Sequence, residues 1–146
     1  MNVTVERVVQ ATPEVHDLIR ELNDVLGAAY EAHQRHGLSI EQLFEPNVRF
    51  FLARLENLGV GCGGVALFDD YAEVKRMYTR PAAGGRGVGK ALLRRIEDEA
   101  RQAGRSVLRI ETGTRQQEAI GLYRAWGFDR EVRSAHMRQC QPATSR

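Results

Sequence analysis

Residues 79–93 read TRPAAGGRGVGKALL, and this stretch decides the fold because it combines a strand end, a glycine-rich turn and a helix start. Four glycines stand within residues 84–89, directly in front of the helix. Glycine lets a ligand approach the backbone closely, and a helix N-terminus presents unpaired N–H groups at the positive end of its dipole. The stretch therefore predicts an anion site suited to a pyrophosphate, to which Arg86 and Lys90 add positive charge. A glycine turn without a ligand is the alternative.

Residues 84–90 also match the G-x-x-x-x-G-K pattern of nucleotide-binding P-loops. The next residue is Ala91, where that motif carries the Ser or Thr whose hydroxyl holds Mg²⁺. The G-x-G-x-x-G spacing of dinucleotide-binding folds does not occur in this stretch. A nucleotide phosphohydrolase is therefore strongly disfavoured.

Outward from the glycine turn, the sequence predicts a mixed α/β layer fold. The strands before the turn have such short connections that an antiparallel meander is the simplest arrangement. Thr12 is a plausible N-cap for the first helix, with Pro13 at its first position. In chain order we expect a strand at 3–9, a helix from 12, a loop with a short helix at 30–47, strands at 48–55, 60–68 and 71–79, a helix at 87–103, a strand at 106–111, a short helix at 118–126, and strands at 128–132 and 135–139.

The composition is that of a globular protein. The 146 residues are 42% hydrophobic and 27% charged, which suits one domain spanning 1–146. No apolar run approaches the roughly 18–20 residues of a membrane span, and the N-terminus does not resemble a signal peptide. Two cysteines, Cys62 and Cys140, fit neither a disulfide framework nor a zinc pattern. We therefore expect a cytoplasmic protein without a membrane partner.

The charges are distributed unevenly along the chain. Residues 1–70 carry 5 Arg against 11 Asp and Glu, whereas residues 71–146 carry 16 Lys and Arg against 8 Asp and Glu. A basic half suits a polyanion and an acidic half suits a cation, although an ordinary solvated surface explains the pattern equally well. Nucleic acid is not the expected partner, because the basic residues do not form one stripe interleaved with aromatic residues.

The glycine stretch resembles the acetyl-CoA-binding motif Q/R-x-x-G-x-G/A of the GCN5-related N-acetyltransferase (GNAT) superfamily. Gly84 stands where that family usually has Gln or Arg, and Arg86 could compensate for the missing phosphate contact. Residues 73–81 are similar to the fourth strand of small bacterial members. Residues 111–113 and 118–128 resemble the fifth strand and the following A-x-x-L-Y-x-x-x-G-F helix. The resemblance runs from about 48 to 128 and is weak before that, where the family's acceptor-binding elements lie.

This resemblance implies a GNAT-type fold with a mixed, mostly antiparallel sheet flanked by helices, in the order β-α-α-β-β-β-α-β-α-β-β. It implies acetyl transfer from acetyl-CoA to a small-molecule or peptide amine, without a metal, and homodimers are frequent in the family. The pantetheine arm would insert between the splayed fourth and fifth strands. A module that binds acyl-CoA without turnover is the alternative. The implied cofactor-binding residues are Met77, Tyr78 and Thr79 for pantetheine, and Gly84, Gly85, Arg86, Gly87, Val88, Gly89 and Lys90 for the pyrophosphate.

Two catalytic residues follow from the same resemblance. Tyr123 matches the family's helix tyrosine and would protonate the leaving thiolate. Glu73 stands where some members carry a catalytic glutamate and would deprotonate the amine. The alternatives are a core tyrosine at 123, and a carboxylate at 73 that pairs with Lys75 or an arginine. Glu111 is a weaker candidate base, and a chain of water molecules could replace either carboxylate.

Histidines offer no metal site in the sequence. His33 and His36 lie three residues apart in a polar segment, without further ligands around them. We therefore expect no metal.

Overall fold

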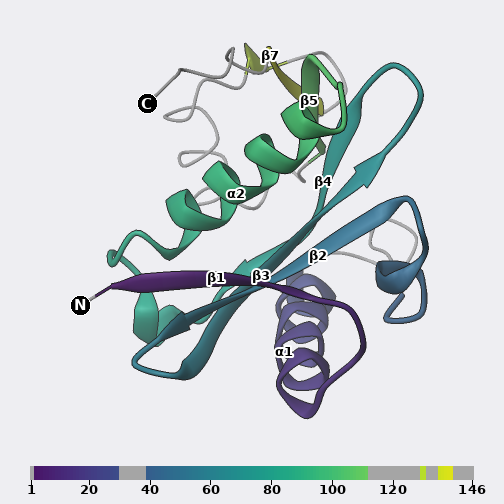
Figure 1. The fold of residues 1–146 in the computed structure, drawn as a ribbon. Helices are drawn as coiled ribbons and strands as arrows, with labels where there is room; N and C mark the ends of the chain where they lie inside the picture. The colour runs from purple at the N-terminus through teal and green to yellow at the C-terminus, as the bar shows by residue number, and fades with distance from the viewer. Residues whose placement is uncertain (1, 30–38, 112–128, 131–134, 140–146) are drawn as a thin grey trace.

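The computed structural model describes residues 2–29, 39–111, 129–130 and 135–139. Over these residues its centre is one sheet of seven strands in the order β1-β2-β3-β4-β5-β7-β6. Figure 1 labels all of these strands but β6. Every pair of neighbouring strands is antiparallel except β4 and β5, which are parallel. The strands are β1 (Val3–Val8), β2 (Val48–Leu55), β3 (Leu58–Leu67), β4 (Ala72–Thr79), β5 (Val107–Glu111), β6 (Asp129–Arg130) and β7 (Ala135–Gln139). The expected mixed, mostly antiparallel sheet is confirmed.

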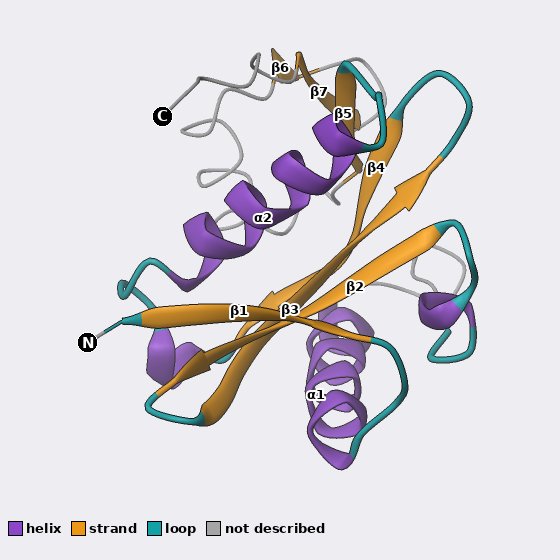
Figure 2. Cartoon of the chain, in the orientation of Figure 1, coloured by secondary structure: helices purple, strands orange, loops and turns teal. Residues whose placement is uncertain are grey.

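Two helices lie on opposite sides of this sheet, α1 (Pro13–Ala29) and α2 (Val88–Gln102) (Figure 2). Short 3-10 helices, Gln42–Phe44 and Pro81–Ala83, precede β2 and follow β4. The element order agrees with the predicted order over the described residues. The predicted helix at 118–126 lies outside them.

Helix α1 begins as the sequence predicts. The backbone N–H of Val15 donates to Thr12 Oγ1 at 3.3 Å, so Thr12 is the N-cap. Val15, Leu18 and Leu22 are buried at helical spacing. Val15, Leu18 and Ile19 belong to the apolar cluster that packs this helix against the sheet.

Helix α2 is fixed at both ends by glycine. Gly87 is its N-cap residue with φ 80°, and Gly104 follows its last turn with φ 79°. The N–H of Arg105 donates to Ala100 O at 2.9 Å, which satisfies a carbonyl of the last turn. The predicted glycine stop at 104 is confirmed.

The hairpin between β2 and β3 is tighter than the sequence suggests. Leu55 pairs with Leu58, so only Glu56 and Asn57 form the turn. Their φ angles are 51° and 71°, and two successive positive φ angles give the turn type whose twist matches a hairpin. Strand β3 consequently begins two residues earlier than expected.

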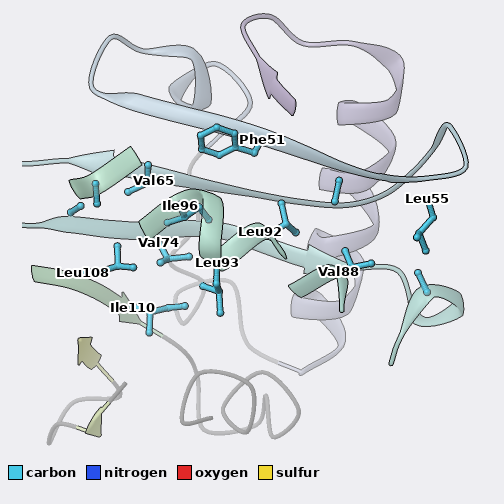
Figure 3. Packing of buried hydrophobic residues seen from close by; sticks show 14 residues of the cluster. Phe51, Leu55, Val65, Val74, Val88, Leu92, Leu93, Ile96, Leu108 and Ile110 are labelled. Carbon is cyan, nitrogen blue, oxygen red and sulfur yellow. The ribbon is translucent and has the colours of Figure 1, made fainter. Parts of the chain in front are cut away.

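The larger core lies between α2 and the sheet. Leu92, Leu93 and Ile96 are fully buried there against Phe51 and Val65 (Figure 3). Glycines of β3 make room for the helix: a Cβ at Gly61 would lie 2.9 Å from Val88 Cγ1, and one at Gly63 would lie 3.3 Å from Ile96 Cδ1. The glycine-rich sequence of β3 therefore lets α2 pack close, and this fixes the position of its N-terminus.

Candidate active site

The sheet opens between β4 and β5. Their pairing consists of three positions, Ala72 with Leu108, Glu73 with Arg109 and Val74 with Ile110. Strand β4 continues to Thr79, still paired with β3. Among the described strands, none pairs with residues 75–79 on the side toward β5. We call residues 75–79 the open segment of β4; its backbone is available for pairing with an extended ligand.

A β-bulge lies where this opening begins. Cys62 pairs with Tyr78 and Gly64 pairs with Lys75, so two β4 residues, Arg76 and Met77, face the single residue between them on β3. Arg76 has φ 53°, a left-handed conformation that is uncommon for residues other than glycine. A bulge bends its strand and increases the local twist, which explains why β4 leaves β5 here.

The glycine loop follows the open segment through Arg80 and the 3-10 helix. Gly85 and Gly87 have φ angles of 78° and 80°, so the left-handed region requires glycine at both positions. The first helical bond of α2 runs from Ala91 N to Gly87 O at 3.0 Å. The N–H groups of residues 88–90 therefore have no acceptor within the helix. They form a donor set for an anion at the end of β4.

The loop residues differ in exposure. Gly84, Gly85, Arg86, Gly87 and Lys90 are exposed, and Gly89 is half-buried. Val88 is fully buried in the core beneath α2, so only its backbone is placed to contact a ligand.

Met77 and Tyr78 place their side chains on opposite faces of the sheet. Met77 packs against the core on the α2 face, and Tyr78 packs against the core on the α1 face. Both side chains, like that of Thr79, are half-buried. This arrangement leaves the backbone of the open segment as the part that can pair with pantetheine.

Glu73 is buried within an ion pair. Its Oε1 lies 2.7 Å from Lys75 Nζ, and the two side chains are 9% and 18% exposed. Arg109 is its register partner on β5. The structure thus shows the ion pair that the sequence left as the alternative, and Glu73 as a base stays a prediction.

Other predicted residues lie outside the described part of the chain. Tyr123, His33 and His36 fall in residues whose structure is not described, and of Glu111 the structure describes only the backbone at the end of β5. Within the described residues, no group of three or more His, Cys, Asp or Glu could hold a metal ion. No helix in this part of the chain is long and apolar enough to cross a membrane.

A polar cluster beside the open segment was not predicted. Arg80 holds Glu21 of α1 through two nitrogens, with Nε to Oε1 at 3.1 Å and Nη2 to Oε2 at 2.8 Å. The hydroxyl of Tyr78 donates to Glu21 Oε1 at 3.2 Å. The hydrogen bonds from Arg80 lower the pKa of the Glu21 carboxyl, while burial and the bond to Glu21 raise the pKa of the Tyr78 phenol. No local spacing could have revealed this cluster, because Glu21 and Arg80 are 59 residues apart.

Comparison with known proteins identifies the class. The model of the acetyltransferase (GNAT) family matches residues 14–128, which include the open segment and the glycine loop. The chain therefore belongs to the acetyltransferase (GNAT) family, and it is an acetyl-CoA-dependent N-acetyltransferase whose acceptor is a small-molecule or peptide amine.

Its relatives agree with this class. The IAA acetyltransferase of Azospirillum brasilense is 46% identical over 129 residues, covering 87% of this chain and 84% of that protein. A GNAT family acetyltransferase from Elizabethkingia anophelis, solved with acetyl-CoA bound, shares the fold with a TM-score of 0.67 and 24% identity over 89% of this chain and 78% of its own. The IAA acetyltransferase of Bacillus cereus ATCC 14579 does so with a TM-score of 0.70 and 21% identity over 90% and 79%.

Proposed function

We propose that acetyl-CoA binds along the open segment of β4, with its pyrophosphate on the glycine loop, and that the acetyl group passes to an amine entering beside α1. One observation supports this assignment above all: β4 stops pairing with β5 after Val74. Beyond the end of the same strand, the first N–H groups of α2 have no acceptor within the helix. Pantetheine amides would pair with the backbone of Met77, Tyr78 and Thr79 as an added strand. The pyrophosphate would accept hydrogen bonds from the loop at 84–90, with charge from Arg86 and Lys90.

The proposed chemistry is a direct transfer. The neutral amine nitrogen attacks the thioester carbonyl, the C–N bond forms, and the carbonyl electrons move to an oxyanion that a backbone N–H of β4 stabilises. Collapse of this intermediate breaks the C–S bond and releases the thiolate. The amine gives up its proton to Glu73 or to water, and Tyr123 donates a proton to the thiolate.

The acceptor and the assembly belong to the same proposal. The name of the Azospirillum relative adds IAA to the compounds to assay beside the amines. Polyamines, amino-acid derivatives, aminoglycosides and peptide amines complete the panel. We expect one domain, a cytoplasmic location and a homodimer, and light scattering on the purified chain tests the last of these.

A thiol-release assay with acetyl-CoA and this panel tests the function. We expect one acceptor class to release CoA well above the rate with acetyl-CoA alone. Tight binding of acetyl-CoA by titration calorimetry without release by any acceptor would instead favour a sensing module. Absence of binding, with the fold intact by circular dichroism, would contradict the site assignment.

Glu73 can be tested beside its partner. Glu73→Gln removes a base but leaves an amide that Lys75 can still bond, whereas Lys75→Met removes the partner and keeps the carboxylate. If Glu73 is the base, only Glu73→Gln lowers kcat, by roughly 10²-fold. If both variants lose the same thermal stability and kcat is unchanged, Glu73 acts only through its ion pair with Lys75 and is not the base.

A further inference from the structure

Arg80, the residue directly after β4, makes a two-nitrogen contact with Glu21 of α1. Arg80 presents the planar fork of its guanidinium to Glu21, and its third nitrogen, Nη1, donates to Gly59 O at 2.9 Å. The side chains of Arg80 and Glu21 are 34% and 33% exposed. A two-nitrogen contact of this kind fixes direction as well as distance, which a lysine ammonium does not.

Arg80 also has a fixed backbone. Its N–H donates to Val60 O at 2.8 Å, directly after Thr79 ends β4 and before Pro81 begins the 3-10 helix that leads to the glycine loop. One residue therefore connects the end of the cofactor strand with β3 and with α1. Any displacement of α1 relative to the open segment must stretch these bonds.

The two halves of α1 are held in different ways. The first half is anchored by its buried apolar face and by Glu14, whose carboxylate binds Arg54 and the N–H of Gly59. After Leu22, the residues at 23–25 are exposed, so this part of the helix buries little against the sheet. Its described polar links run to β4 and to Arg80 directly after it: Glu21 bonds Arg80 and Tyr78, and Asn23 Oδ1 accepts from Arg76 Nη2.

These polar links face the place where the acceptor must arrive. The thioester lies beside the open segment in the proposed function, and α1 covers the adjoining face of the sheet. Glu21–Arg80 and Asn23–Arg76 therefore link the second half of α1 to the open segment and to the residue directly after it.

We propose that Arg80 and Glu21 are positioning residues that set the distance between α1 and the open segment of β4, and thereby the width of the acceptor entrance. This inference rests on the proposed function. In the described contacts Glu21 meets the open segment through the Tyr78 hydroxyl and not through the backbone that would pair with pantetheine, so we expect the pair to govern acceptor binding rather than cofactor binding or chemistry.

The test uses four variants of the full chain. Glu21→Gln removes the charge of the carboxylate, Arg80→Gln removes the guanidinium, and Arg80→Lys keeps the charge without the fork. Arg20→Gln is the matched control, because Arg20 neighbours Glu21 on α1 and pairs with Asp17 at 2.9 Å on the exposed surface.

Kinetics with the best acceptor of the panel give the first readout. For Glu21→Gln and Arg80→Gln we expect the KM for the amine to rise about tenfold, while kcat and the KM for acetyl-CoA stay within about twofold. Arg80→Lys should recover part of the loss, and Arg20→Gln should match the parent. A pair that only stabilises the fold would lower the melting temperature and leave the amine KM unchanged, which would overturn the inference.

Hydrogen exchange gives a second readout that needs no acceptor. Amides of residues 20–29 should exchange faster in Glu21→Gln and Arg80→Gln than in the parent, whereas those of 14–19 should not change. If the parent acetylates no amine in the panel, the proposed function fails. The inference is then judged by exchange alone, and unchanged exchange at 20–29 overturns it.

Discussion

The two faces of the sheet are built in different ways. On the α2 face, the core is continuous and apolar, and glycines of β3 bring the helix close to the sheet. On the α1 face, the buried cluster is smaller, and ion pairs between Arg54 and Glu14 and between Arg80 and Glu21 hold the helix at both ends of its packed region. A close-packed apolar layer resists displacement, whereas polar links at a half-exposed surface give way more easily.

This difference suits a transferase with one constant substrate, the cofactor, and one variable substrate, the acceptor. The α2 face places the helix N-terminus and the glycine loop, which bind the cofactor in the proposed function. In the same proposal the α1 face borders the acceptor, and this face is held by polar links at both ends of the packed helix.

The first prediction concerns Gly87 on the cofactor side. A valine there would be strained at φ 80° and would stand in the path of the pyrophosphate. We expect Gly87→Val to weaken acetyl-CoA binding about 100-fold or more, measured by titration calorimetry. Gly104→Val is the matched control, because Gly104 has φ 79° and equally open surroundings at the other end of α2. If both variants lose affinity equally, the loss reflects helix strain and the phosphate binds elsewhere.

The second prediction concerns Tyr123 and the protonation of the leaving thiolate. Tyr123→Phe keeps the ring and removes the phenol proton, so kcat should fall roughly 10²-fold while acetyl-CoA affinity stays nearly constant. Tyr71→Phe is the control, since the Tyr71 ring stacks on Phe68 with centroids 4.9 Å apart at the β3–β4 turn. If kcat of Tyr123→Phe is unchanged under conditions where chemistry limits turnover, water and not Tyr123 protonates the thiolate.

The sequence predicted the cofactor side better than the acceptor side, for a physical reason. The glycine turn, the N-terminus of α2 and its apolar stripe are contiguous within residues 84–103, so local spacing determines them. The family resemblance implied the opening of the sheet, but the bulge beside it, where Arg76 has a positive φ, is a conformation that no propensity favours. The Glu21–Arg80 pair depends on how α1 packs across the sheet, and no pattern within either segment encodes that distance.

The third prediction compares one glycine from each face of β3. A Cβ at Gly61 would lie 2.8 Å from the Tyr78 carbonyl oxygen and 2.9 Å from Val88 Cγ1, so β4 or α2 must shift. We expect Gly61→Ala to lower the free energy of unfolding by about 1–3 kcal/mol in urea titrations and also to weaken acetyl-CoA binding. Gly64 faces α1, and a Cβ there would lie 3.1 Å from Phe50 Cδ1. Gly64→Ala should therefore cost less and leave cofactor affinity unchanged; equal loss of affinity in both would contradict the division between the faces.

The smallest expected effect is an acid sensitivity of the α1 face. Hydrogen bonds from Arg54 lower the pKa of Glu14, and those from Arg80 lower the pKa of Glu21, both from an ordinary value of 4.5. A carboxyl whose pKa is lower in the folded state stabilises the fold above its unfolded pKa, and this contribution is lost as the pH falls through the folded pKa. We expect the melting temperature of the parent to fall more steeply below pH 4.5 than that of Glu14→Gln or Glu21→Gln, with small differences because these side chains are partly solvated. Hydrogen exchange should locate the change: acid should first speed exchange in α1, while α2 stays protected. If acid first speeds hydrogen exchange in α2, the helix on the apolar face is displaced more easily than the helix on the polar face, which contradicts the comparison.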